Sequence, residues 1–157
     1  MNSLMRAMQW VASTPPVTWL YLNVFPLLDK PLLRLTRGRL SVSVGQPVLL
    51  LTTIGAKSGQ ERSTPLLYIE HGDDVLLIAS NGGSPRHPAW YHNLRANPQA
   101  TLTFGGKSEV YVAREAQGDE RVELWKVARE TYLGFERYQH RAAGRRVPVM
   151  ILSREGG

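Results

Sequence analysis

Residues 47–79 read PVLLLTTIGAKSGQERSTPLLYIEHGDDVLLIA and carry the clearest structural signal of the chain. Apolar and β-branched residues gather in three runs that are each typical of a buried strand, at 47–53, 62–69 and 75–79. Glycine-containing turns separate these runs, at 54–60 and 71–74. The stretch therefore predicts three strands that are linked by hairpins.

The pattern continues toward the C-terminus. A polar loop at 80–88 contains two glycines and two prolines, and Pro88 suits the first turn of a short helix at 89–96, which Asn97-Pro98 ends. The other expected elements are strands at 100–104, 108–113 and 147–152, and a helix at 120–133 with Asp119 as its N-cap. Roughly six strands that do not alternate with helices predict a mainly β (α+β) fold, a small antiparallel barrel with flanking helices.

Length and composition limit the classes of protein. The 157 residues suit one compact domain, and 43% hydrophobic with 20% charged residues is ordinary for a globular chain. The sequence has no cysteine, which excludes a disulfide framework, a thiolate metal site and a cysteine nucleophile.

The chain is basic, with 19 Lys and Arg against 13 Asp and Glu and a formal net charge of +6. This excess is concentrated at 1–40 and 137–146 and suits a polyanionic partner such as nucleic acid, an acidic membrane or an anionic cofactor. Solubility alone is the simpler explanation. An RNA-binding barrel would need aromatic side chains among basic ones on its strands. The strands here are aliphatic, so we expect no nucleic acid partner.

We expect residues 1–28 to form a helical, amphipathic segment that precedes a single barrel domain at 29–157. Pro15-Pro16 interrupts any signal peptide, and the apolar stretch 17–28 is shorter than the about 18 residues that span a bilayer. Its aromatic side chains and the basic residues that follow suit a helix on the surface of an anionic membrane. The alternative is that they cover the core or form a dimer interface. The expected location is the cytoplasm, with peripheral contact to the inner face of the cell membrane as one of these two alternatives.

Two glycine-rich turns are candidate binding sites. The turn at 55–62 exposes backbone N–H groups between Lys57 and Arg62 and suits a phosphate or carboxylate, although its spacing is not that of a P-loop. The loop at 80–88 enters a helix N-terminus, where free N–H groups suit an anion or a polar ring edge. A solvated turn is the alternative for the first site. His87 and His92 do not have metal-ligand spacing, so we expect no metal.

A third candidate is the aromatic set Tyr132, Phe135 and Tyr138, spaced three apart near the end of the predicted helix. Such a stripe suits the wall of an apolar pocket, in which the phenols supply a proton or a hydrogen bond. Ordinary packing is the alternative. The spacing of residues indicates no Ser-His-acid or paired-carboxylate site, so any catalysis would depend on a bound cofactor.

These residues resemble the deazaflavin-dependent nitroreductase family, split-β-barrel reductases that use coenzyme F420. The resemblance runs from about Asp29 to Leu152 and rests on separated motifs in one order. They are LTRGR at 35–39, LLTTIGAKSG at 50–59, RSTPL at 62–66, ASNGG at 79–83, PAWYHNL at 88–94 and GRRVPV at 144–149.

The resemblance implies a split barrel of the PNPOx or FMN-binding type, with the cofactor in a basic groove. Its polyanionic tail would lie on the first turn, at Lys57, Ser58, Gly59 and Arg62. Its ring would lie along Pro65, Leu66, Leu67, Ala79, Ser80 and Asn81, with Gly82, Gly83, Trp90 and Asn93 nearby. The catalytic hydroxyls would be those of Tyr132, Tyr138 and Ser80.

The implied reaction is hydride transfer from reduced F420 to a quinone, an activated enone or a nitroaromatic compound. Phe135 stands where nitroimidazole-reducing relatives are expected to carry a hydroxyl, which favours quinones and enones. Two alternatives remain at this point: an FMN-binding oxidoreductase with the same barrel, and a non-catalytic carrier of an anionic or lipidic ligand. We expect a monomer or a homodimer.

Overall fold

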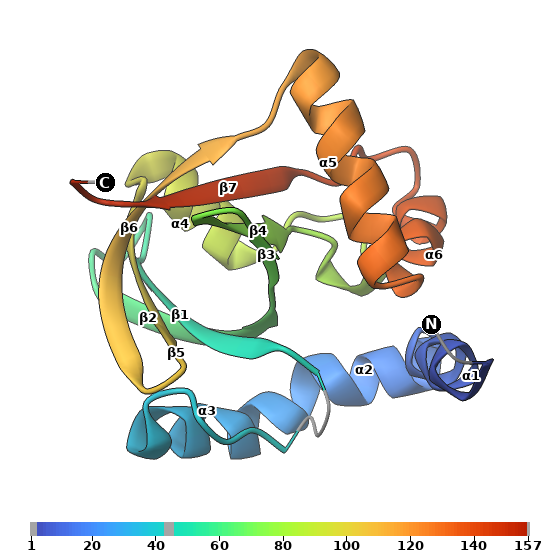
Figure 1. Cartoon of the computed structure of the whole chain (residues 1–157), viewed down its shortest axis with the longest axis horizontal. Helices are drawn as coiled ribbons and strands as arrows, with labels where there is room; N and C mark the ends of the chain where they lie inside the picture. Colours follow the sequence, from blue (N-terminus) through green and yellow to red (C-terminus); the bar gives the residue numbers. More distant parts are fainter. Residues whose placement is uncertain (1–2, 43–45, 157) are drawn as a thin grey trace.

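The computed structural model describes residues 3–42 and 46–156. In these ranges seven strands form one antiparallel sheet with the order β2-β1-β5-β6-β7-β4-β3, which curls into a half-open barrel (Figure 1). The strands are β1 Val48–Ile54, β2 Glu61–Leu67, β3 Ile69–His71, β4 Asp74–Ile78, β5 Gln99–Phe104, β6 Lys107–Glu115 and β7 Val149–Arg154. The expected mainly β split barrel is confirmed.

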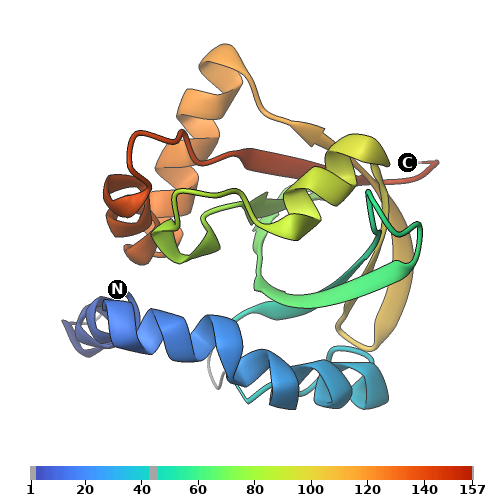
Figure 2. The same ribbon diagram turned by 180° about the vertical axis from the view of Figure 1, so that it is seen from behind.

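The helices surround this barrel in separate groups. Those that the structure describes are α1 Ser3–Ala12, α2 Pro15–Asn23, α3 Phe25–Thr36, α4 Ala89–Ala96, α5 Gly118–Thr131 and α6 Gly134–Arg141, with a short 3-10 turn, η1, at Asn81–Gly83. Helices α1 to α3 run along one side of the barrel, and α5 and α6 lie on another (Figure 1). Helix α4 crosses the side that the sheet leaves open (Figure 2).

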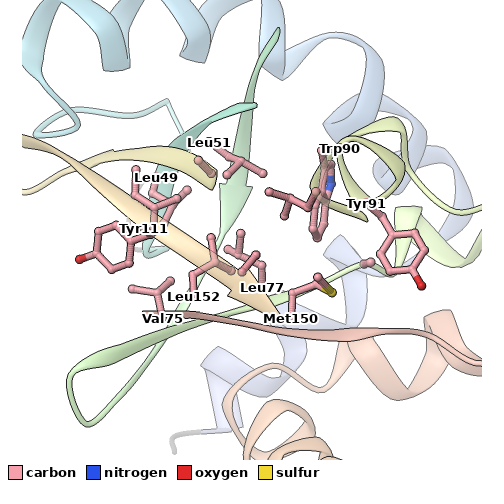
Figure 3. Packing of buried hydrophobic residues seen from close by; sticks show 14 residues of the cluster. Leu49, Leu51, Val75, Leu77, Trp90, Tyr91, Tyr111, Met150 and Leu152 are labelled. Carbon is pink, nitrogen blue, oxygen red and sulfur yellow. The ribbon is translucent and has the colours of Figure 1, made fainter. Parts of the chain in front are cut away.

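Strands β4 and β7 are buried on both faces. Val75 and Leu77 of β4 point into the barrel, where they belong to the same apolar cluster as Trp90 of α4 (Figure 3). Leu76 and Ile78 point the other way and belong to a second apolar cluster beneath α5 and α6. Because successive side chains of a strand face opposite ways, a strand covered on both faces reads as a continuous apolar run. This explains the sequence VLLIA that follows the hairpin turn at 71–74.

The sheet has one more strand than the sequence indicated. The run 62–69 was expected as one strand, but it divides at Tyr68 into β2 and β3. The reason is a change of partner, since β2 pairs with β1 whereas β3 pairs with β4. The last strand begins at Val149 instead of residue 147.

The expected helix at 120–133 with Asp119 as N-cap was also wrong in its ends. Helix α5 has Gln117 as its N-cap and stops at Thr131, because Tyr132 takes an extended conformation. Tyr132 therefore follows α5, while Phe135 and Tyr138 lie on α6. The three rings are in contact, but they come from two elements and do not form a stripe along one helix.

The N-terminal helices are joined to the barrel through α3, which packs on β1 and β2. The expected domain boundary at residue 28 falls inside α3, and residues 1–2, 43–45 and 157 of the two expected segments lie outside the described residues. After α3 the backbone turns at Gly38, whose N–H donates to the carbonyl oxygen of Leu33 at 2.7 Å. Gly38 has a φ of +76° and lies directly against the backbone of β5.

The contact at Gly38 leads to a stability prediction. A Cβ at this position would overlap the Cα of Phe104 and lie 2.7 Å from the carbonyl oxygen of Thr103. Gly38→Ala should therefore lower the free energy of unfolding by more than the roughly 1–3 kcal/mol that a strained positive φ costs by itself. Gly105→Ala is the matched control, because Gly105 has a φ of +60° and no atom within 4 Å of an added Cβ. Urea denaturation compares the two, and equal losses would contradict the steric argument.

Candidate functional site

A buried amide holds the basic turn between β1 and β2. Asn93 of α4 is 7% exposed, and its Oδ1 accepts a hydrogen bond from the Ala56 N–H at 2.9 Å. Its Nδ2 donates to Thr53 Oγ1 at 3.1 Å. Within the turn, Gly55 N–H donates to the Gln60 carbonyl at 2.7 Å. The turn is thus fixed to the helix that covers the open side of the barrel, and the amide of Asn93 is occupied in fixing it.

The turn presents two cations to solvent. Lys57 and Arg62 are exposed, and neither forms an ion pair with a carboxylate in the described residues. Ser58 and Gly59 lie between them and are also exposed. Paired cations on a fixed turn are suited to charge-assisted hydrogen bonds with phosphate or carboxylate oxygens. The residues present therefore fit the polyanionic tail that the sequence led us to expect.

Strand β2 continues from this turn. Because side chains alternate along a strand, Arg62 and Leu66 share one face, and Leu66 packs against the apolar cluster inside the barrel. Leu67 packs against the second cluster. Pro65 shares a face with Ser63, whose hydroxyl accepts a hydrogen bond from Arg34 of α3 at 3.1 Å. Of the three β2 residues that were expected along the cofactor ring, only Leu66 has its side chain on the same face as Arg62.

The loop after β4 is fastened by one arginine. The guanidinium of Arg145 donates to the carbonyl oxygens of Ala79 at 3.1 Å, Ser80 at 2.8 Å and Ser84 at 3.0 Å. Ala79 and Ser80 are buried, and Asn81, Gly82 and Gly83 follow in η1 with positive φ angles. A planar guanidinium with five donors can hold several carbonyl groups of one loop at once. The conformation of the predicted ring-binding loop therefore depends on Arg145.

Arg145 also sets the state of a histidine. Its Nη1 lies 2.9 Å from Nδ1 of His87, and since arginine has only donors, Nδ1 must accept. Burial, and then the positive charge of Arg145, lower the pKa of His87. The imidazole is therefore neutral at pH 7, with its proton on Nε2.

The hydroxyl groups of Tyr132 and Tyr138 lie next to each other. Tyr132 and Tyr138 are 7% and 8% exposed, and their hydroxyl oxygens lie 3.2 Å apart. Thr18 of α2 lies 3.5 Å from the Tyr138 hydroxyl. Burial raises the pKa of Tyr132 well above its usual value, and the neighbouring Tyr138 raises it further. Tyr132 therefore remains a neutral hydroxyl that can donate a hydrogen bond but resists ionisation.

The structure brings the glycine loop and the tyrosines together. A Cβ at Gly83 would lie 2.9 Å from the carbonyl oxygen of Tyr138, and one at Gly82 would meet Thr18 of α2. Helix α4 connects this end to the basic turn, since it follows the loop at 80–88 and carries Asn93. Helix α4 thus links the loop at 80–88 to the basic turn, and a single elongated site along α4 stays a prediction. Trp90 is 6% exposed within the barrel core, and its contact with a cofactor stays a prediction.

Sequence reasoning did not single out three residues that contact the predicted ones. Thr18 lies beside Tyr138, Arg141 beside Gly83, and Arg145 holds Ala79 and Ser80. Arg145 belongs to the motif GRRVPV, but nothing in the motif indicates which loop it holds. Thr18 meets residues more than 100 positions away, and such a contact leaves no local pattern. The one local indication was the basic segment 137–146, which contains four arginines and no acidic residue.

Other features of the described residues do not belong to this site. A cavity of about 110 Å³ lies on the Tyr91 side of α4 and is lined by His87, Glu115, Arg121 and Arg146, among others, but by none of the predicted site residues. Within residues 3–42 and 46–156, no group of His, Asp or Glu could hold a metal ion. No helix described there is both long and apolar enough to cross a membrane.

Comparisons with known proteins agree on one family. Residues 32–154 match the F420H(2)-dependent quinone reductase family. An F420H(2)-dependent quinone reductase of Mycobacterium tuberculosis is 39% identical over 132 residues, which are 81% of this chain and 88% of that protein.

Solved structures give the same result. An F420-H2 dependent reductase, FDR-A, is 42% identical with a TM-score of 0.62, over 68% of this chain and 94% of that one. A domain-swapped dimer is 36% identical with a TM-score of 0.64, over 88% of this chain and 99% of that one. The family match covers most of the barrel, from α3 to the end of β7. The chain belongs to the F420H(2)-dependent quinone reductase family.

Proposed function

We propose that this chain reduces a quinone with F420H(2) in the elongated site along α4, with the cofactor tail on the turn at 55–62 and the acceptor beside Tyr138. The observation that carries this assignment is the pair of exposed cations, Lys57 and Arg62, on a turn held by a buried amide. A polyanionic tail gives these unpaired charges a partner. Membership of the family favours this function over the FMN-binding and carrier alternatives.

The cofactor, when bound, supplies a hydride, and the protein supplies position and electrostatics. Lys57 and Arg62 bind the tail. Arg145 fixes the carbonyl groups of Ala79 and Ser80, so the loop has one conformation against which a flat ring can be held. A ring held at near van der Waals distance from its acceptor gains the advantage of orientation.

At the acceptor, the hydroxyl pair donates hydrogen bonds. A quinone that takes up a hydride carries a negative charge on oxygen, and fixed donors beside that oxygen stabilise it. Tyr132 and Tyr138 are such donors, and Ser80 is the third hydroxyl of this region. Phe135 packs beside them without a hydroxyl, which supports quinones or enones over nitroimidazoles as acceptors.

The substrate also bears on location. Most of the exposed large apolar side chains of the described residues lie before residue 43, and they include Leu4 at 72%, Trp19 at 61%, Leu27 at 73% and Leu35 at 85%. Arg34, Arg37 and Arg39 are exposed on the same segment. An apolar face with basic residues suits an anionic membrane surface, from which a lipid-soluble quinone can be taken up. We propose peripheral membrane contact through α1 to α3.

The function is tested by following the oxidation of F420H(2) with a panel of menaquinone analogues, enones and nitroaromatic compounds. Turnover with quinones supports the proposal, and its absence with every acceptor refutes it.

The double variant Lys57→Ala with Arg62→Ala should weaken F420 binding by about 3–6 kcal/mol, because each charge-assisted bond contributes about 1.5–3 kcal/mol. Lys126→Ala with Arg129→Ala removes the same charge from exposed positions on α5 and should leave the affinity unchanged. Calorimetry that finds no difference between the two double variants rejects the tail assignment.

Proton supply gives the next prediction. Tyr138→Phe keeps the ring and removes one donor, so turnover should fall about 10²-fold or more while the affinity for F420 stays level. Tyr111→Phe is the control, since Tyr111 is buried inside the barrel and its hydroxyl accepts from Arg154 at 3.3 Å. A drop of less than about threefold in Tyr138→Phe, well below the general-acid range, means that solvent supplies the proton.

Membrane contact is tested by flotation with vesicles of phosphatidylglycerol and phosphatidylcholine at low salt. The wild-type chain should float, and Trp19→Ser with Leu27→Ser should reduce the floating fraction severalfold, because two exposed apolar side chains lose their burial in lipid. Val122→Ser on α5 is the control, as Val122 is 48% exposed on a different side. If the wild-type chain stays at the bottom, the membrane proposal is wrong. Sedimentation equilibrium then checks whether a second copy covers this face.

A further inference from the structure

Arg141 is a partly buried cation that no carboxylate of the described residues neutralises. It is the last residue of α6, and its Nε is buried with no hydrogen-bond partner. Its Nη2 reaches Thr18 Oγ1 only at the long distance of 3.5 Å. None of the ion pairs between described residues includes Arg141.

The ring of Tyr138 and a long hydrogen bond to Thr18 are weak partners for an arginine with a purely structural role. Withdrawing a guanidinium from water is costly unless a carboxylate or several acceptors replace the water. Arg145, four residues later, shows the ordinary solution, since its donors reach three backbone carbonyls and His87. Arg141 has no comparable set of acceptors, so part of its charge is available to a molecule that binds beside it.

The surroundings of Arg141 are those of the proposed acceptor site. Its guanidinium carbon lies 5.1 Å from the ring centroid of Tyr138. Its Cβ is 2.9 Å from the position that a Cβ on Gly83 would take, so its stem lies against the loop proposed to hold the cofactor ring. Arg141 therefore lies beside both that loop and the ring of Tyr138.

The proposed reaction creates a negative charge at this place. The reduced cofactor loses a hydride and a proton, and the hydride brings two electrons and one proton to the quinone. The quinone becomes the hydroquinone monoanion, and one proton from solvent or from a hydroxyl donor completes the hydroquinone. Tyr132 resists ionisation because burial raises its pKa, so the charge on the acceptor oxygen needs stabilisation from another group until that proton arrives.

We propose that Arg141 is a catalytic residue of this reductase, whose guanidinium stabilises the negative charge that hydride transfer places on the quinone oxygen. This inference rests on the proposed function and adds a residue to it. A fixed cation in a water-poor site acts on the charged product and much less on the neutral quinone, so it accelerates the hydride transfer.

The test separates charge from packing with two ligands of similar shape. The anion of 2-hydroxy-1,4-naphthoquinone, which is ionised at neutral pH, stands for the charged product, and neutral 1,4-naphthoquinone stands for the substrate. Arg141→Gln should weaken binding of the anion about tenfold or more, as expected for a lost hydrogen bond to a charged group, and leave binding of the neutral quinone within about twofold. The turnover number with F420H(2) should fall about 10²-fold.

Arg137→Gln is the matched control. Arg137 lies one turn earlier on α6 and also contacts the N-terminal helices, through the Trp10 carbonyl at 3.0 Å and Ser13 Oγ at 2.8 Å. The variant Arg137→Gln should bind the anion in preference to neutral 1,4-naphthoquinone to the same degree as the wild-type chain. If Arg141→Gln does not fold, Arg141→Lys replaces it and should retain most of this preference, because the charge remains.

Equal preference for the anion in the wild type and in Arg141→Gln, or equal loss in Arg137→Gln, overturns the role of Arg141. Complete loss of the preference in a folded Arg141→Lys also overturns it, since charge would then not be the cause. A wild-type chain that oxidises no F420H(2) with any quinone refutes the proposed function instead. The binding ratio is measured without cofactor, so the two failures are distinguishable.

Discussion

Strands β4 and β7 have to bury both of their faces, and this constraint determines where the site lies. Inside the barrel their side chains join the apolar cluster that includes Trp90 of α4, and outside they join the cluster that includes apolar residues of α5 and α6. The outer layer must therefore lie directly over the end of β4. Since the loop at 80–88 leaves β4 at that end, Tyr138 of the outer layer comes to lie beside Gly83. Packing of apolar residues thus brings the proposed ring-binding loop and the hydroxyl pair together.

A few buried polar groups then fix what apolar packing leaves loose. Asn93 joins the basic turn to α4, and Arg145 joins the loop after β4 to the segment before β7. Losing one such partner leaves a buried donor or acceptor unsatisfied, at a cost of about 1–3 kcal/mol. These two residues act on backbone groups of the site and leave the exposed cations Lys57 and Arg62 free for a ligand. Positioning and binding are thus divided between different side chains.

Local patterns predicted much of this arrangement. Helix α4 has the expected bounds 89–96, because a proline before it and Asn97-Pro98 after it leave few alternatives. Hairpin-linked strands predicted a small antiparallel barrel, and the resemblance carried by motifs in a fixed order implied the split barrel and the family. What local patterns could not supply was the division at Tyr68, where the chain changes partner, and the end of α5 at Thr131. Both are decided by tertiary contacts, which override propensity.

The same distinction separates the two ends of the site. The basic turn is local in sequence, so Lys57 and Arg62 were visible as a pair before the fold was known. The proposed acceptor end is assembled from α2, η1, Tyr132 and α6, and its members are up to 123 positions apart, as Thr18 and Arg141 are. Tyr132 and Tyr138 also belong to the second apolar cluster, so their rings contribute to stability while their hydroxyls remain paired with each other. Helix α2 lies beside this pair, since its Thr18 contacts the Tyr138 hydroxyl, and it exposes apolar side chains such as Trp19 to solvent. The segment that covers the proposed acceptor site is therefore also the one whose exposed surface suits a membrane, which links uptake of an apolar quinone to the place where it would be reduced.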